Sequence, residues 1–473
     1  MRNHLFVLAV LLGTITAAAQ TTGGPYSFSM EEAVTFALDS NYTAINARRD
    51  IAIALKQKWE ATAAGLPQID ANLGYTNNIK LPVSLLPAAA FDNRESVVST
   101  VEEYFDIERT GSPTPPDGFI PVTFGTQQSF NATATLNQLI FDGSYLVGLQ
   151  AAKTFLNFSE NANEKTQLEV RRGVINSYCS VLLAEEFVRI FTENRDNVAD
   201  NLRETQKIFE NGLTEEEDVE QLEITYVELE TTVQNAERQL IIARQMFNLS
   251  LGIDIQTPVT LTQNLDDLAE SNIQLELMDN ALNMENNVDY KIAINLTEQR
   301  ELETKLEKSR FYPNLFAYIN YGTSAFENDF AFLDSDTPWF QSSAFGVSMN
   351  IPIISSGARS ARTQQARIAE EQAQTQLTET MQSIRLEYDT AKSNYRFAIE
   401  VYQNAKKNLS LSERIERKNS VKFVEGLSTS FELRQAQLQL YTAQERYFQS
   451  MLDLINRKTE LETVLNTPAL RNN

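Results

Sequence analysis

Two short stretches of the sequence, FENGLTEEEDV at residues 209–219 and FVEGLSTSFEL at residues 423–433, share one pattern. In both, a Phe is followed at the same spacing by Gly, Leu, a hydroxyl residue and an acid, and the copies lie 214 residues apart (423 − 209). Glycine tolerates the left-handed backbone that ends a helix, and Ser or Thr caps the next helix. The repeated pattern therefore predicts two helical hairpins built on one plan.

The chain that leads to each turn is expected to be helical over an unusual length. Gly143 and Gly357 each lie 69 residues before the turn glycine of their half (212 − 143 and 426 − 357), and neither arm contains proline. Good helix formers dominate both arms. At 1.5 Å per residue such a helix spans roughly 100 Å, which is too long for a compact domain.

The arms that return from the turns carry apolar residues at intervals of seven, a spacing typical of helices that pack side by side. These residues are Tyr226, Val233, Leu240 and Phe247 in the first half, and Leu440, Tyr447, Leu454 and Leu461 in the second. We expect the first return arm to cover 214–250 and the second to end near Asn466. Further helices are expected at 30–64 and 276–310.

Internal duplication sets the domain boundaries that we predict. Residues 20–257 form a first structural repeat and 258–466 a second, each with a helix, a strand pair and a long hairpin; 467–473 form a tail. The first repeat carries an insertion of 32 residues between Pro67 and Gly143 (76 residues, against 44 from Pro313 to Gly357), and it falls in the stretch that contains Pro82, Pro87, Pro113, Pro115, Pro116 and Pro121. The insertion is rich in proline, which is typical of a loop.

Four short segments alternate apolar and polar residues and are predicted to be strands. Their apolar positions are Ile69, Ala71, Leu73 and Tyr75; Phe130, Ala132, Ala134 and Leu136; Leu315, Ala317, Ile319 and Tyr321; and Phe345, Val347, Met349 and Ile351. Such strands form either a small sheet on a soluble protein or the lipid-facing wall of a barrel. An open sheet edge is not tolerated in lipid. If the strands cross a membrane, several copies of the chain must therefore combine to close a barrel.

The amino terminus has the pattern of a secretory signal, predicted to be residues 1–19 with cleavage after Ala19. A membrane anchor is the alternative, but the apolar run from Leu5 to Leu12 is too short to span a bilayer as a helix, which takes about 20 residues.

Composition excludes several classes of function. The formal net charge is −23, with one histidine (His4, within the predicted signal) and one cysteine (Cys179). Without other histidines the mature chain offers no Ser-His-Asp triad and no His-ligated zinc. We therefore predict no catalytic residue, no bound metal and no cofactor, and the negative charge argues against a nucleic-acid partner. Carboxylate pairs are plentiful, but none lies in a context that indicates an enzyme.

Taken together, the signal, the duplicated strand pairs, the long arms and the GL[ST]xxx[ED] turns resemble the TolC family of outer-membrane efflux ducts. SMEEAVTFALDSNYTAI at 29–45 is similar to the N-terminal helix of that family, and LIFDGS at 139–144 to its strand-to-helix junction. The resemblance implies a mainly α chain with four transmembrane β-strands. Three copies would close into a 12-stranded barrel in outer-membrane lipid, with a helical tunnel in the periplasm.

The same resemblance implies partners and site residues. The partners would be a periplasmic adaptor and an inner-membrane pump of the RND or ABC class, in a tripartite efflux or type I secretion system. The adaptor would dock at the two tip turns, which are Gly212, Leu213, Thr214, Gly426, Leu427 and Ser428. Carboxylates just beyond the turns would narrow the tip as a periplasmic gate, and Asp218 and Glu432 occupy those places. Because Glu215, Glu216 and Glu217 crowd the first turn, the choice of constriction residue stays open.

Two other functions remain as alternatives at this point. A periplasmic adaptor also has a helical hairpin, but one hairpin rather than two, and it lacks strand pairs ahead of each. A structural coiled-coil protein of the cell envelope would leave the strand pairs unexplained. The sequence names neither the transported substrate nor the class of pump.

Overall fold

The computed structural model describes residues 26–108, 111 and 116–466. The predicted signal peptide (1–19) and tail (467–473) lie outside the described residues. The chain forms two compact units, and the first contains the described parts of 1–52, 157–296 and 374–473. The second unit contains the described parts of 53–156 and 297–373. The units are described separately below.

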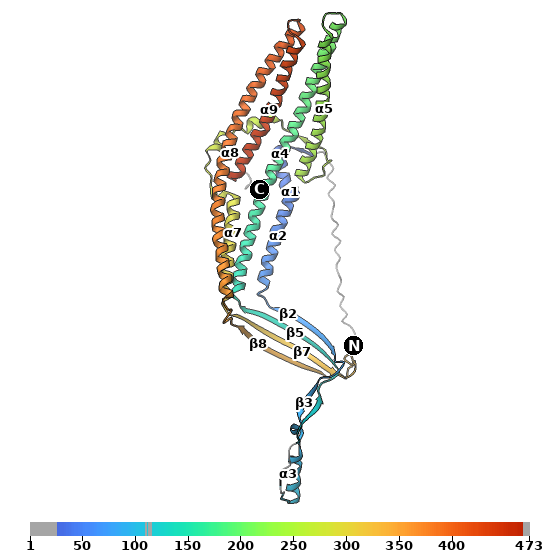
Figure 1. Cartoon of the computed structure of the whole chain (residues 1–473), viewed down its shortest axis with the longest axis vertical. Helices are drawn as coiled ribbons and strands as arrows, with labels where there is room; N and C mark the ends of the chain where they lie inside the picture. Colours follow the sequence, from blue (N-terminus) through green and yellow to red (C-terminus); the bar gives the residue numbers. More distant parts are fainter. Residues whose placement is uncertain (1–25, 109–110, 112–115, 467–473) are drawn as a thin grey trace, which may run out of the picture. The chain divides into compact units, whose positions relative to one another are not determined.

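The second unit is built on a four-stranded antiparallel sheet. Its strands are β2 (Gln68–Asn77), β5 (Gln128–Phe141), β7 (Asn314–Glu327) and β8 (Trp339–Asn350), in the spatial order β2-β5-β7-β8 (Figure 1). All four strands predicted from alternation are present. Strands β2 and β8 form the two edges, so each is paired on one side only within the chain.

The register brings the predicted apolar residues together on one face of the sheet. Ile69 pairs with Leu136, Leu136 with Ile319, and Ile319 with Phe345, so one apolar row crosses all four strands. Ile69 is 71 % exposed and Phe345 72 % exposed, so none of the described residues covers these two ends of the row. The row of alternate residues beside it, Asp70, Thr135, Asn320 and Ala344, lies on the opposite face. The sheet therefore has one apolar and one mainly polar face.

An aromatic cluster lies at the ends of the strands where β7 turns into β8. The ring of Phe332, which is 5 % exposed, packs against Tyr75 and Phe130 at centroid distances of 6.0 and 5.8 Å. Phe130 also contacts Trp339, and Tyr75 contacts Phe330. The loop between β7 and β8 thus folds its aromatic side chains onto this end of the sheet.

The insertion predicted as a loop has its own secondary structure. It contains a two-stranded ribbon of β3 (Val83–Pro87) and β4 (Phe119–Thr123), a 3-10 turn η1 (Ala88–Phe91) and helix α3 (Arg94–Phe105). The Asn78 amide donates to the Gln127 carbonyl at 2.7 Å, which closes the neck of the insertion. A sequence rich in proline is therefore compatible with an ordered ribbon, because a strand at the edge of a sheet tolerates proline, which has no N–H to donate.

The first unit contains most of two long helical hairpins, and the leading helix of each begins with residues that belong to the second unit. In one, α4 (Gly143–Glu210) leads to α5 (Glu216–Leu251); in the other, α8 (Ala358–Val424) leads to α9 (Ser430–Leu465). Both turns lie at one end of this unit (Figure 1). Each long helix follows the predicted glycine-to-glycine arm to within two residues at its end.

The helix predicted at 30–64 is interrupted. Helix α1 (Met30–Ser40) ends at Asn41, and α2 (Tyr42–Ala63) follows. The prediction of one continuous helix was wrong because the end of α5 abuts this point: Ser40 Oγ donates to the Leu251 carbonyl at 2.5 Å and Asn41 Nδ2 to the Ser250 carbonyl at 2.8 Å. These contacts hold Asn41 in an extended conformation with ψ 135°.

The helix predicted at 276–310 starts later than expected. Residues Leu275–Asp279 (η2) and Met284–Asn286 (η3) form 3-10 turns, and α7 runs from Val288 to Ser309. The start was wrong because side chains from α8 bind the backbone ahead of it. Tyr395 Oη accepts from the Gln274 amide at 2.9 Å, and Tyr388 Oη donates to the Asn280 carbonyl at 2.7 Å.

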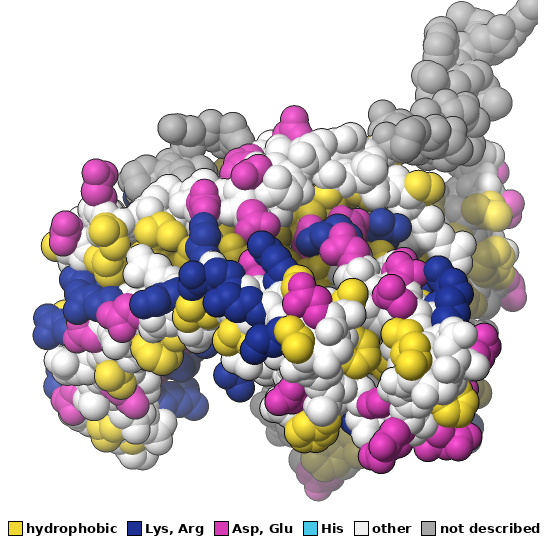
Figure 2. All heavy atoms as spheres, turned by 90° about the horizontal axis from the view of Figure 1, so that it is seen from above, with side chains coloured by type: hydrophobic (Ala, Val, Ile, Leu, Met, Phe, Trp, Pro, Cys, Tyr) yellow, Lys and Arg dark blue, Asp and Glu magenta, His cyan; other side chains and the backbone are white. Residues whose placement is uncertain are grey.

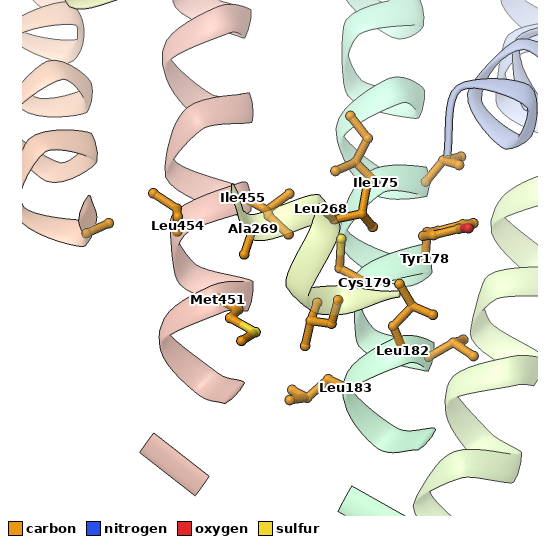
Figure 3. Close-up of a cluster of buried hydrophobic side chains, with 14 of the residues drawn as sticks. Ile175, Tyr178, Cys179, Leu182, Leu183, Leu268, Ala269, Met451, Leu454 and Ile455 are labelled. Atoms are coloured by element: carbon orange, nitrogen blue, oxygen red, sulfur yellow. The ribbon is translucent and has the colours of Figure 1, made fainter. Parts of the chain in front are cut away.

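The main core of the first unit forms where α6 (Leu265–Ser271) lies between α4 and α9 (Figure 3). Cys179 and Leu182 of α4, Leu268 of α6, and Met451 and Ile455 of α9 are all buried there. The same core includes Phe28 of β1 (Tyr26–Phe28), which pairs in parallel with β6 (Val259–Leu261). Residues from both sequence repeats thus share one core.

Acidic, basic and apolar side chains are interspersed on the face seen in Figure 2, so the net charge of −23 does not give a surface of one sign there. In the part of the chain that the structure describes, none of the helices combines the length and the hydropathy needed to cross a membrane.

Candidate functional site: the two hairpin tips

The two turns at the hairpin tips have the same backbone geometry. Gly212 and Gly426 both have φ of +72°, the left-handed region that favours glycine. The amide of Leu213 donates to the carbonyl of Ile208, five residues back, at 3.1 Å, and the amide of Leu427 donates to that of Lys422 at 2.8 Å. This bond, with a second one from each glycine amide, satisfies carbonyls at the helix end. The leucines that follow are 78 % and 72 % exposed, respectively.

A hydroxyl–carboxylate hydrogen bond also recurs in both turns. Thr214 Oγ1 donates to Asp218 Oδ2, and Ser428 Oγ donates to Glu432 Oε2, each at 2.6 Å. The four residues occupy matching positions in the duplicated pattern. The two acids predicted as gate residues are therefore held by the hydroxyl residues predicted as part of the docking turns.

The caps of the returning helices differ between the tips. Thr429 caps α9 with a reciprocal pair of bonds: its hydroxyl accepts from the Glu432 amide at 3.2 Å, and its amide donates to Glu432 Oε2 at 3.3 Å. The matching position at the start of α5 is Glu215, which makes no side-chain capping bond. Acidic residues fill the first turn of α5 instead, where the helix dipole favours negative charge.

One contact joins the tips of the two hairpins. Ser430 Oγ, at the start of α9, donates to Asp218 Oδ1, at the start of α5. Asp218 thus accepts from hydroxyls of both hairpins, Thr214 in its own and Ser430 in the other. Ser430 is 4 % exposed, whereas Asp218 is only partly buried. Glu432 differs, because among the described residues it hydrogen-bonds only within its own turn, to Ser428 and Thr429.

Both carboxyls are biased toward the ionised form. Burial raises the pKa of Asp218, but the hydrogen bonds from Ser430 and Thr214 outweigh it, so the net pKa lies below the ordinary value. For Glu432 the Ser428 hydroxyl and then the Thr429 amide lower the pKa. Both groups are charged at neutral pH.

Apolar packing supports the tips from within the first unit. Val198 of α4 and Leu222 and Leu229 of α5 form a small buried cluster against which Tyr441 of α9 packs. Burial raises the pKa of the Tyr441 hydroxyl. On α8, burial likewise raises the pKa of the Glu416 carboxyl. The hairpins are therefore in contact over a stretch and not through the Asp218–Ser430 bond alone.

The sequence pattern located the turns but did not identify Ser430 as a functional residue. The available signal was the run of hydroxyl residues Ser428, Thr429 and Ser430, since the second of these caps the helix and leaves the third free for another contact. In the described residues no group of three or more His, Cys, Asp and Glu side chains could hold a metal ion.

Comparison with solved structures shows the fold. The chain matches the outer membrane protein VceC from Vibrio cholerae with a TM-score of 0.65 and 16 % identity, over 92 % of this chain and 95 % of VceC. It matches the Campylobacter jejuni CmeC outer membrane channel with a TM-score of 0.68 and 15 % identity, over 92 % and 85 % of the two chains. For CusC the TM-score is 0.69 and the identity 15 %, with 95 % of each chain covered.

No curated protein matches the chain at the sequence level. A family model described as "Outer membrane efflux protein" does match, over residues 109–252 and 284–467. The matched residues include both long hairpins and three strands of the sheet, and they make up more than half of the chain. The resemblance to the TolC family is thereby confirmed, and the adaptor and coiled-coil alternatives are set aside. The chain belongs to the outer membrane efflux protein family, whose members are non-enzymatic outer-membrane channels of tripartite efflux systems.

Proposed function

We propose that this outer-membrane efflux channel works as a homotrimer whose hairpin tips receive a periplasmic adaptor. An inner-membrane pump of the RND or ABC class would then drive substrates through it to the exterior. The observation that carries the proposal is the sheet with two open edges. Within the described residues, strands β2 and β8 each lack a partner on one side, and unpaired backbone groups cost several kcal/mol each in lipid.

The number of strands favours three copies. Each chain supplies four, so joining the β8 edge of one copy to the β2 edge of the next closes a barrel of 12 strands. Two copies would give 8 strands, a barrel whose interior is filled by side chains and leaves no wide lumen. A duct for exported molecules needs the larger barrel.

The two faces of the sheet support its place in the membrane. Exposed apolar residues such as Ile69, Ile319 and Phe345 suit contact with lipid, and the opposite, mainly polar face suits an aqueous lumen. The aromatic cluster around Phe332 lies at one end of the strands. Aromatic side chains are enriched at that level of a membrane barrel, where lipid meets water.

The matching tips support adaptor docking. Gly212, Leu213 and Thr214 present nearly the same surface as Gly426, Leu427 and Ser428, and each surface projects an exposed leucine. Exposed apolar side chains on a rigid turn are suited to anchor a partner. We further propose that Asp218 and Glu432 form carboxylate rings at the tip of the trimer, which would attract cations and repel anions.

A pair of lysine substitutions tests the membrane assignment. Phe345→Lys places a charge on the apolar face, which costs about 2–4 kcal/mol near the bilayer midplane. Ala344→Lys, one residue earlier, places the same charge on the opposite face. We expect Phe345→Lys to reduce the yield of trimer extracted from outer membranes at least tenfold, measured by light scattering in detergent, and Ala344→Lys to spare it. Equal yields of the two variants, or a wild-type protein that is monomeric in detergent, would contradict the proposal.

A further inference from the structure

The insertion between β2 and β5 exposes an apolar surface that none of the described residues covers. Helix α3 has no buried residue. Its apolar residues Val97, Val101, Tyr104 and Phe105 recur at the spacing of one helix face, and all are exposed, Tyr104 by 81 %. The opposite face carries Glu95, Ser99, Glu102 and Glu103. The family model begins at residue 109 and so leaves α3 outside its match.

Such an insertion is not expected to hold its structure alone. Isolated helices shorter than about 12–15 residues are marginal in water, and α3 has 12 residues. A two-stranded ribbon by itself is also marginal. The ribbon of β3 and β4 adds more uncovered apolar residues, including Leu85 (64 % exposed) and Phe119 (67 % exposed). A partner that buries the apolar face of α3 would stabilise the whole insertion.

Charge argues against a lipid surface as that partner. Between residues 94 and 108 the sequence has one basic residue, Arg94, and five acids: Glu95, Glu102, Glu103, Asp106 and Glu108. Arg94 is paired with Asp92 at 2.7 Å, so it offers little to a phosphate. Membrane-surface helices instead carry Lys and Arg beside their apolar face, because these residues bind anionic headgroups.

The position of the insertion favours a second copy of this chain. The insertion follows β2, which is an edge strand of the sheet, so in a trimer it leaves the barrel beside the seam with the next copy. Twelve strands spaced about 4.8 Å apart at a tilt of about 40° enclose a radius of roughly 12 Å. A ribbon of five-residue strands is about 17 Å long, so it can carry α3 as far as the threefold axis.

We propose that the α3 helices of three copies pack against one another through Val97, Val101 and Phe105 and form a helical cap over the outer end of the barrel. The inference rests on the proposed homotrimer. The apolar faces bury one another at the axis, and the acidic faces point outward into water, where repulsion between the copies is screened.

Disulfide trapping tests the cap in the full-length protein. Val101→Cys places a thiol in the centre of the apolar face, and Ser99→Cys places one on the opposite face as a matched control. The native Cys179 does not interfere, because it is fully buried and burial raises its pKa to about 12. Under mild oxidation, Val101→Cys should link up to about two thirds of the chains into dimers on a denaturing gel, since a disulfide joins two of three copies. Ser99→Cys should give at least tenfold less.

The mass of each variant in detergent, measured on the same sample, separates the two proposals. A trimer in which Val101→Cys forms no more dimer than Ser99→Cys overturns the cap and leaves the trimer intact. A monomer overturns the trimer, and the cap with it. Adding Val97→Glu to the Val101→Cys variant should reduce the dimer band several-fold, because packing of the α3 helices would then place the new carboxylate against the apolar face of a neighbouring α3. An unchanged band would contradict packing through this face.

Discussion

At the scale of single residues, Asp218 is the centre of the tip, because it is the acceptor for hydroxyls of both hairpins. Sequence reasoning placed it beside Glu432 as an equivalent. The structure gives the two acids different surroundings, since Ser430 binds Asp218 and its counterpart in the first repeat is Glu216. Which of the two carboxylates lines a constriction stays a prediction.

Removal of the Ser430 hydroxyl should loosen the tip. Ser430→Ala takes away the bond to Asp218 and leaves a partly buried carboxylate with one fewer donor, at a cost of about 1–3 kcal/mol. We expect a higher conductance in planar bilayers. Thr442→Ala is the matched control, because the Thr442 hydroxyl is bonded only to the Leu438 carbonyl of its own helix. Equal conductance of Ser430→Ala and wild type would show that the Ser430–Asp218 bond does not restrict the channel at its tip.

The tip should also respond to acid through Asp218. Its folded pKa lies below the unfolded value of 3.8, so the carboxylate stabilises the folded tip above that pH. The contribution is lost as the pH falls through the lower folded pKa. Between pH 7 and pH 3 the melting temperature of the wild type should therefore fall more than that of Asp218→Asn. Parallel curves for the two proteins would show that the carboxylate is not linked to stability.

At the scale of elements, the turns depend on two glycines. Gly212→Ala and Gly426→Ala force a side chain into φ of +72°, which costs about 1–2 kcal/mol each. Gly173→Ala, in the interior of α4, should act in the opposite direction, because a Cβ there meets no neighbouring atom and alanine favours helix by about 1 kcal/mol. Differential scanning calorimetry should show lower melting temperatures for the first two variants and a higher one for the third. A stabilised Gly426→Ala would refute the argument.

The sequence predicted elements well where the cause was local. Arm lengths, turn glycines and strand alternation depend on neighbouring residues, and the corresponding helices and strands are all present. It failed where a distant side chain decided the backbone. Tyr395 binds the backbone at Asn272 and Gln274, more than 100 residues away, just ahead of the segment where a helix was predicted and a 3-10 turn forms instead. The contact between Ser430 and Asp218 is equally remote in sequence, and no local pattern indicates it.

At the scale of the whole molecule, the exposed tip leucines are expected to meet the adaptor. A photo-crosslinking residue at Leu213 or at Leu427 should trap a periplasmic adaptor that mass spectrometry identifies. The same residue at Ile79, which is 92 % exposed but lies in the insertion, should not. Capture of the adaptor from position 79 alone would place docking elsewhere on the channel.

The parallel pairing of β1 with β6 imposes an order on how the chain can fold. Tyr26 pairs with Val259, and Tyr178 Oη donates to the Phe28 carbonyl at 3.1 Å. Strand β1 therefore cannot complete its contacts until residues much later in the sequence have been synthesised. The shared core can be completed only later, because it includes Leu465 near the end of α9. Contacts so distant in sequence form slowly, and the apolar segments remain open to aggregation meanwhile. In an incomplete or truncated chain, the apolar residues of β1 therefore have no partner to bury them. Such a chain should depend on chaperones until α9 has been synthesised.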